Sequence, residues 1–238
     1  MAVAMRDYQK DFINKLAPYA VADWNANHTV LPSVTLSQGL REAAWGRSEL
    51  AVKANNLFGV KAGDAWPGKV YVKNTEEYYD GVNPSIIKDA FRVYDNWGQG
   101  VTDHSTFLRK PRYAEACGQT NFTLACNYIK KGGYATGPYY SANLVRDIIG
   151  YELYKYDPVQ PDFNEIIRVQ IGAYSQKENA QRAVQKLQAA GFQYCIIYGN
   201  DTKLYYVQTG AYKDKVTAST VFCNLILAGF APIIKIKK

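Results

Sequence analysis

The 238-residue sequence is poor in the residue types that mark metal centres and membrane segments. It has only two histidines, His28 and His104, and its four cysteines form no Cys-x-x-Cys pair, so no metal-ligand spacing is present. No stretch approaches the ~18 consecutive apolar residues of a membrane span. We therefore expect no cofactor, no metal site and no membrane insertion. The cysteines are predicted to be reduced, mostly buried thiols, with a Cys117–Cys126 disulfide as the open alternative.

The first twenty residues also lack the apolar core of a signal peptide. We expect a protein made in the host cytoplasm without its own export signal. If its target lies outside the membrane, something else must release it. We expect it to act as a monomer.

Aromatic side chains and positive charge are abundant instead. Aromatic residues make up 14% of the chain, and 20 residues are tyrosines, whose rings can stack on sugars and nucleobases. The net charge is +7, and residues 161–238 hold ten basic but only five acidic side chains. A basic module favours anionic partners such as nucleic acid, acidic lipid or a wall polymer.

The sequence divides into two predicted domains. The proline- and aspartate-containing segment 156–162 breaks every periodic pattern, which places domains at 1–156 and 165–238 with a linker at 157–164. Beyond it, Val169–Tyr174 returns as Val207–Tyr212, 38 residues later, and Ala190-Gly191-Phe192 returns at the same offset. Each copy predicts strand, helix, strand, so the repeat predicts a small ferredoxin-like β-α-β-β-α-β domain.

The N-terminal domain is predicted to be mainly helical with one β-hairpin. The hairpin runs through 70–79 and 86–94, around an Asp80-Gly81 turn signal. The fold class is therefore α+β. The predicted helices cover residues ~5–20, ~33–44, ~97–108, ~121–131 and ~139–154.

One acidic side chain in this domain has the setting of a proton donor. Gln38, Glu42 and Trp45 are spaced by four and three residues, which puts them on one helix face, and Trp45-Gly46 is expected to end the helix. A neighbouring indole and the negative end of the helix dipole should both raise the pKa of Glu42. A carboxyl that stays protonated near neutral pH can protonate a glycosidic oxygen. On spacing alone, a surface glutamate is the alternative.

These residues lie in a longer pattern that resembles glycoside hydrolase family 73, which contains cell-wall N-acetylglucosaminidases. The resemblance covers roughly residues 5–155 and implies a lysozyme-like fold with Glu42 as general acid. It rests on motifs in family order: the Gln-x-x-x-Glu-x-x-Trp-Gly-x-Ser run at 38–48, Asn-Asn-Leu-Phe-Gly at 55–59, Thr75–Gly81, Phe-Arg-x-Tyr at 91–94 and Gly-Tyr-Ala-Thr at 133–136.

The resemblance also implies a second carboxylate in the hairpin. Glu77 is the first choice and Glu76 the alternative, since neighbouring strand residues point to opposite faces. Whether it activates water, attacks the sugar or leaves attack to the substrate's acetamido group stays open. Arg92 is expected to be structural, with sugar binding as the alternative. The motif residues expected to contact substrate are Gln38, Trp45, Asn56, Phe58 and Tyr134.

The C-terminal repeat resembles the SPOR (sporulation-related repeat) domain, which binds peptidoglycan. Strand alternation puts Arg168 and Gln170 on the predicted open face of the sheet, with Tyr206 and Gln208 in the equivalent places of the second copy. We expect these four side chains to contact sugars. A merely solvated sheet face is the alternative.

Together these patterns predict a peptidoglycan hydrolase of the endo-β-N-acetylglucosaminidase type that lyses bacterial walls. A muramidase or lytic transglycosylase is the alternative of the same class. An RNA-binding fold would place aromatic rings where Gln170 and Gln208 stand. A wall-binding protein with an inactive hydrolase domain would not need Glu42. By analogy, such a chain suits a phage endolysin, or alternatively a lysin of a spore-forming mother cell.

Overall fold

The computed structural model describes residues 4–77, 85–161, 163 and 165–236, without the side chains at 75–77, 85–87 and 216. The chain forms two compact units, 4–118 and 119–238. The first contains α1 (Asp7–Asn27), α2 (Pro32–Glu42), α3 (Glu49–Ala54), β1 (Val70–Glu77), β2 (Ser85–Arg92), α4 (Trp97–Leu108) and the 3-10 helix η1 (Pro111–Ala116).

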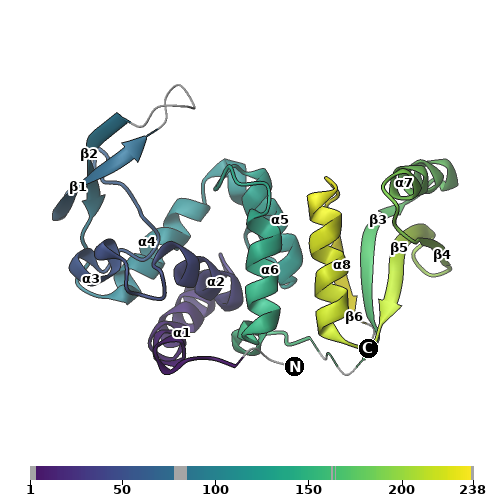
Figure 1. Cartoon of the computed structure of the whole chain (residues 1–238), viewed down its shortest axis with the longest axis horizontal. Helices are drawn as coiled ribbons and strands as arrows, with labels where there is room; N and C mark the ends of the chain where they lie inside the picture. Colours follow the sequence, from purple (N-terminus) through teal and green to yellow (C-terminus); the bar gives the residue numbers. More distant parts are fainter. Residues whose placement is uncertain (1–3, 78–84, 162, 164, 237–238) are drawn as a thin grey trace. The chain divides into compact units, whose positions relative to one another are not determined.

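In the first unit, α1 packs against both α2 and α4 (Figure 1). Pro32 occupies the first turn of α2, where its fixed φ suits the helix and its missing N–H costs nothing. All nine residues from Pro32 to Leu40 are buried. Burial of both polar and apolar side chains makes α2 the central helix of this unit, and its C-terminal end positions Glu42.

The strands β1 and β2 form an antiparallel hairpin whose register runs from Val70 opposite Arg92 to Glu77 opposite Ser85. Glu49, at the start of α3, contacts the hairpin. It accepts a hydrogen bond from Tyr71 Oη at 2.6 Å and lies 3.3 Å from Lys73 Nζ. The hairpin is therefore tied at its side to the helical part of the unit.

The second unit combines several helices with an antiparallel sheet. It contains α5 (Phe122–Lys131), α6 (Tyr140–Gly150), η2 (Leu153–Tyr156), β3 (Ile167–Tyr174), α7 (Lys177–Ala189), β4 (Cys195–Gly199), β5 (Leu204–Tyr212), α8 (Lys215–Leu227) and β6 (Ile233–Ile236). The strands pair antiparallel in the order β4-β5-β3-β6. The predicted β-α-β-β-α-β order and the α+β class are confirmed.

Some boundaries differ from those predicted. The helix expected over 139–154 ends at Gly150, and Glu152 adopts a left-handed conformation (φ 56°) before the short η2. The short α3 and η1 were not predicted, since six residues carry too little periodicity. The compact units divide at residue 118, because α6 packs on α8; the linker at 157–164 stays a prediction about the sequence modules.

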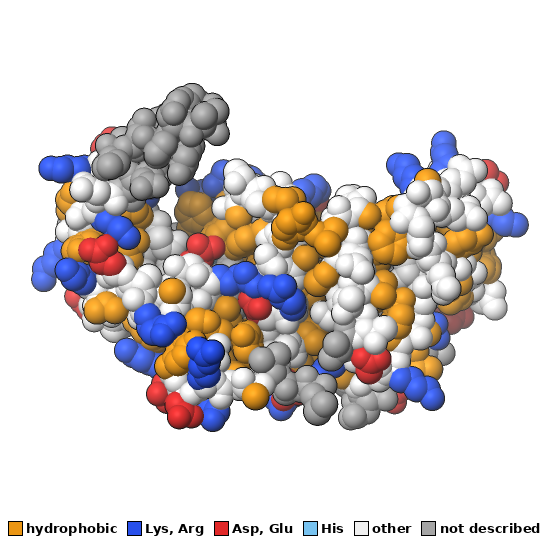
Figure 2. Space-filling view, in the orientation of Figure 1, with side chains coloured by type: hydrophobic (Ala, Val, Ile, Leu, Met, Phe, Trp, Pro, Cys, Tyr) orange, Lys and Arg blue, Asp and Glu red, His pale blue; other side chains and the backbone are white. Residues whose placement is uncertain are grey.

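The visible surface mixes hydrophobic side chains with charges of both signs (Figure 2). None of the helices in the described part of the chain is long and apolar enough to cross a membrane. Within the same residues, no group of His, Cys, Asp and Glu side chains is arranged to hold a metal ion.

Candidate active site

Glu42 is the last residue of α2, and the chain turns sharply after it. Ala44, Trp45 and Gly46 have φ values of 47°, 60° and 74°, three left-handed residues in succession. The Trp45 N–H donates to the carbonyl of Leu40 at 3.0 Å, which closes the helix end. The helix therefore stops earlier than predicted and leaves Glu42 at its C-terminal edge.

The predicted placement of Trp45 on the helix face of Glu42 is wrong. Because Trp45 lies beyond the helix in a left-handed conformation, helical spacing does not apply to it. Its ring packs edge-on against Phe12 and Tyr8 of α1, at centroid distances of 5.9 and 6.4 Å. A Cβ on Gly46 would come within 2.9 Å of the Phe12 ring, so this turn is closely packed around its glycine.

The Glu42 carboxyl combines accessibility with a raised pKa. The side chain is exposed, so a substrate can reach it. Partial burial by surrounding protein atoms raises its pKa, and the neighbouring Arg41 opposes this. The helix C-terminus also disfavours negative charge there. Glu42 therefore keeps its proton to higher pH than an ordinary glutamate, which a general acid requires.

The pH dependence of cleavage should report the pKa of Glu42, which burial raises and Arg41 lowers. A general acid works in its protonated form, so kcat should fall as pH rises through the raised pKa of Glu42. Since Arg41 lowers that pKa, Arg41→Gln should move the alkaline limb of the kcat profile to higher pH. The profile is measured on a soluble glycan substrate. Arg47→Gln is the matched control and should leave the profile unchanged. An alkaline limb that stays in place or moves to lower pH in Arg41→Gln would contradict the role of Glu42 as general acid.

Three residues predicted to contact sugar are interior instead. Gln38 is 0% exposed, Asn56 is 1% exposed and Phe58 is 6% exposed. Their burial leaves these side chains little surface to offer a sugar, and direct sugar contacts by them stay predictions. These motif residues build the framework near Glu42 rather than an exposed surface.

Asn56 connects its loop to the hairpin. Its Nδ2 donates to the carbonyl oxygens of Val60 and Arg92, both at 2.9 Å, and its Oδ1 accepts from Val60 N at 3.0 Å. Asn55, in a left-handed conformation, donates from Nδ2 to the Tyr94 carbonyl at 2.9 Å. The two asparagines thus hold the end of β2 against the segment that follows α3.

Phe58 fixes the same loop to α4. Its ring stacks on His104 with centroids 4.0 Å apart and an interplanar angle of 14°. Complete burial lowers the pKa of His104 to about 3, so its imidazole is neutral. The pair is an apolar contact between loop and helix.

A cluster at the base of the hairpin was missed by the sequence reasoning. Arg92 Nη1 lies 2.7 and 2.9 Å from the two carboxylate oxygens of Asp103, and Tyr94 Oη donates to Asp103 at 2.6 Å. The Arg92 guanidinium also lies 4.4 Å from the centre of the Trp66 ring. These contacts support the structural role expected for Arg92. The motif pointed to Arg92 and Tyr94, but no spacing rule connects them to Asp103 on α4.

The two candidates for the second carboxylate lie at the end of β1. Glu77 is the last residue of β1, opposite Ser85, and Glu76 precedes it. Their side chains lie outside the described residues, so their roles stay predictions.

The other predicted contacts lie in the second unit. Tyr134 stacks with Tyr140 at 5.6 Å, and its role in substrate binding stays a prediction. The predicted exposure of Gln170 and Gln208 is wrong: they pair across β3 and β5, and each is 6% exposed. Both residues lie on the two central strands of the sheet.

Arg168 and Tyr206 are more accessible. Both are half-buried. Arg168 Nη1 donates to Gln208 Oε1 at 3.5 Å, and Tyr206 Oη donates to Thr202 Oγ1 at 2.9 Å. Sugar contacts by these two side chains remain a prediction.

Two family matches account for most of the chain. The family described as mannosyl-glycoprotein endo-beta-N-acetylglucosaminidase matches residues 17–153, and the SPOR domain matches residues 164–235. The first match spans more than half of the sequence, so the chain belongs to this glucosaminidase family, and it carries a SPOR domain behind the glucosaminidase region.

Known relatives agree with this placement. The exo-glucosaminidase LytG of Bacillus subtilis (strain 168) is 34% identical over 166 residues, which cover 67% of this chain and 57% of that protein. A probable N-acetylmuramidase of Lactococcus lactis subsp. lactis (strain IL1403) is 34% identical over 168 residues, or 66% and 37% of the two chains. The matched region is thus about half of these relatives or less.

Solved structures resemble the chain as well. The catalytic domain of the autolysin Auto from Listeria monocytogenes superposes with a TM-score of 0.59 at 29% identity, covering 65% of this chain and 90% of that one. A peptidoglycan hydrolase from Sphingomonas sp. A1 gives a TM-score of 0.52 at 30% identity, covering 62% and 92%. The helical part with its hairpin is therefore the lysozyme-like fold of this family.

Proposed function

We propose that the protein is a peptidoglycan hydrolase that cleaves β-1,4 glycosidic bonds of the glycan strand as an endo-β-N-acetylglucosaminidase. The observation that carries this proposal is the exposed carboxyl of Glu42, with its raised pKa, at the C-terminal end of a buried helix. Relatives named as an exo-glucosaminidase and a probable N-acetylmuramidase support the substrate class.

Glu42 acts as the general acid in this mechanism. Its proton passes to the glycosidic oxygen while the bond to the anomeric carbon breaks, so the leaving sugar departs as a neutral alcohol. Positive charge then develops on the remaining sugar, which a nearby carboxylate stabilises. We assign this second role to Glu77, which activates water or attacks the anomeric carbon according to its distance from Glu42.

The SPOR domain supports wall binding in this proposal, with Arg168 and Tyr206 as its candidate sugar contacts. Its net positive charge favours the anionic polymers of a bacterial wall. On this proposal the protein acts at the cell wall as a monomer, and binding raises the local concentration of glycan near Glu42.

Product analysis tests the choice of bond. Purified peptidoglycan is digested, the fragments are reduced with borohydride, and the reduced ends are identified by mass spectrometry. A glucosaminidase leaves reduced N-acetylglucosamine ends. Reduced muramic acid ends would instead identify a muramidase, and anhydro ends would identify a lytic transglycosylase, either of which overturns the proposed specificity.

Paired substitutions test the second carboxylate. Glu77→Gln should lower kcat by about 10²-fold or more, because charge stabilisation or water activation is lost. Glu76→Gln makes the same chemical change at the neighbouring position of the strand, and its kcat should stay within a few-fold of wild type. The initial rate at which reducing ends are released from peptidoglycan measures the activity of both variants. The reverse ranking would assign the role to Glu76, and two near-normal variants would support a substrate-assisted mechanism.

A further inference from the structure

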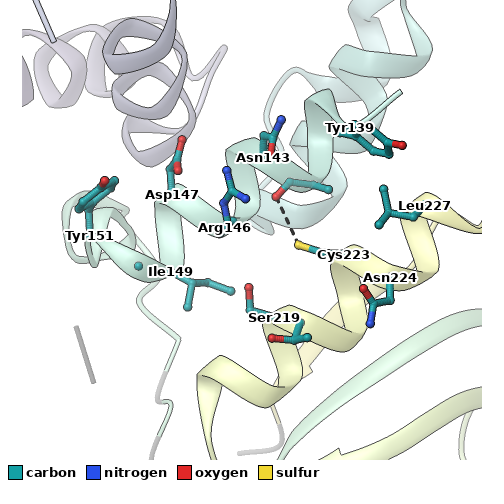
Figure 3. A pocket seen from close by; sticks show the side chains of 13 residues that line it. Tyr139, Asn143, Arg146, Asp147, Ile149, Tyr151, Ser219, Cys223, Asn224 and Leu227 are labelled. Carbon is teal, nitrogen blue, oxygen red and sulfur yellow. Dashed lines mark hydrogen bonds between the residues drawn. The ribbon is translucent and has the colours of Figure 1, made fainter. Parts of the chain in front are cut away.

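Helix α8 is covered on two sides. Ala218, Phe222 and Leu225 follow helical spacing and are 0–1% exposed, and α8 packs against β3, β5 and β6. A second stripe, which includes Ser219 and Cys223, lies toward α6, and α6 and α8 are in contact (Figure 3). Both stripes of α8 are thus covered by neighbouring elements. The SPOR helix therefore packs on the glucosaminidase-region helix α6.

Polar contacts hold these two helices in register. Cys223 Sγ donates to the carbonyl of Ala142 in the first turn of α6 at 3.6 Å. Near the start of α8, Lys215 Nζ donates to Glu152 Oε1 at 2.5 Å and to Tyr154 Oη at 3.3 Å. Further hydrogen bonds join α5 to the segment around β6. The space between α6 and α8 is consequently preformed, which lowers the entropic cost of binding a ligand there.

A groove of about 640 Å³ lies between α6 and α8 (Figure 3). This volume is in the range of small-ligand sites. The buried residues that line it are apolar (Ala142 and Ile149) and polar (Asp147 and Ser219), and its accessible edges carry exposed side chains. Those edges include Tyr139, Arg146 and Asn224. The groove thus combines a floor of apolar and polar side chains with hydrogen-bond donors and an aromatic ring at its rim.

This combination matches one chemical class well. A pyranose has an apolar C–H face for an aromatic ring and hydroxyl groups for polar side chains, and its acetamido group presents one donor and one acceptor to an amide or guanidinium. Among the described residues, no hydrogen bond or ion pair uses the Arg146 guanidinium or the Asn224 side-chain amide. Both groups are available to a ligand. Tyr139, 52% exposed, lies beside α6 at the same groove.

We propose that this groove binds a segment of a β-1,4-linked chain of N-acetylated amino sugars. The inference rests on the proposed function, because it assigns a second contact site for the same polymer, away from the sheet face of the SPOR domain. Tyr139 stacks on a sugar ring, and Asn224 and Arg146 hydrogen-bond to acetamido and hydroxyl groups. The groove is lined by helices of both sequence modules, so its ligand bridges them.

Binding is tested on the full-length chain in the Glu42→Gln background, with chitotetraose as the probe. Titration calorimetry gives the Kd, and ¹⁵N NMR follows the Asn224 side-chain amide, assigned by its loss in Asn224→Ala. The groove variant Arg146→Ala/Asn224→Ala should weaken binding at least about tenfold. The control Lys177→Ala/Gln181→Ala removes the same kinds of group from the exposed surface of α7 and should stay within about twofold.

An unmoved Asn224 signal at saturating probe, absence of any binding, or equal affinity of the groove and control variants would each overturn the groove. Peptidoglycan cleavage by the chain with Glu42 intact is measured in parallel. Cleavage without binding at the groove removes this inference alone. Binding at the groove without cleavage retains it and removes the proposed hydrolase function.

Discussion

Replacing Glu42 by glutamine is expected to reduce the rate of glycan cleavage by about 10²–10⁴-fold, the usual contribution of a general acid. Glutamine keeps the size and planarity of the side chain but has no acidic proton. Since Glu42 is exposed at the end of α2, its substitution leaves the buried face of the helix intact. The loss should therefore appear in kcat on purified peptidoglycan, with little change in thermal unfolding.

Glu115→Gln is a matched control for this experiment. Glu115 is an exposed glutamate on η1 of the same unit, so the exchange has the same chemistry outside the candidate site. It should retain normal cleavage. If Glu42→Gln cuts as fast as this control, Glu42 is not the acid. If both variants are inactive, the loss of cleavage comes from damage to the fold of the unit and not from the removal of a proton donor.

Asn56→Ala is expected to lower the free energy of unfolding by about 3 kcal/mol. The substitution removes three hydrogen bonds at a site that is 1% exposed, and each buried group left without a partner costs about 1–3 kcal/mol. The lost groups join Val60 to the end of β2 at Arg92. We also expect slower cleavage, because the hairpin that carries Glu77 is anchored there.

Urea denaturation followed by circular dichroism measures this change. Asn25→Ala, at an exposed position of α1, removes the same side chain without buried partners and should change stability by less than about 0.5 kcal/mol. Equal midpoints for the two variants would show that the Asn56 network does not stabilise the fold. Reduced stability with normal cleavage would show that the anchor is dispensable for positioning the hairpin.

Local patterns in the sequence were sufficient for the main elements. Helical spacing located α2 and α4, because each side of a helix repeats over several turns. The 38-residue repeat predicted both halves of the C-terminal sheet, since each copy forms the same unit. Spacing placed Glu42 near a helix end but left a surface glutamate as the alternative; the resemblance to glycoside hydrolase family 73 made it the general-acid candidate.

The roles of the motif side chains could not be read in this manner. The family pattern predicts that Gln38, Asn56 and Phe58 contact substrate, yet all three are buried. Burial depends on which other segments cover a side chain, and a local pattern does not show this. The Trp45 ring was misplaced because three left-handed residues interrupt the helical spacing. A backbone turn of this kind leaves little periodic signal.

The sequence by itself determined the order of the main elements, the internal repeat and the position of Glu42 near the end of α2. These depend on interactions between residues close along the chain. Only the tertiary structure decided that Asp103 holds Arg92, that the motif asparagines support the hairpin, and that α6 and α8 enclose a groove. Those contacts join residues from 11 to about 80 positions apart, where packing of whole elements, rather than local spacing, brings side chains together.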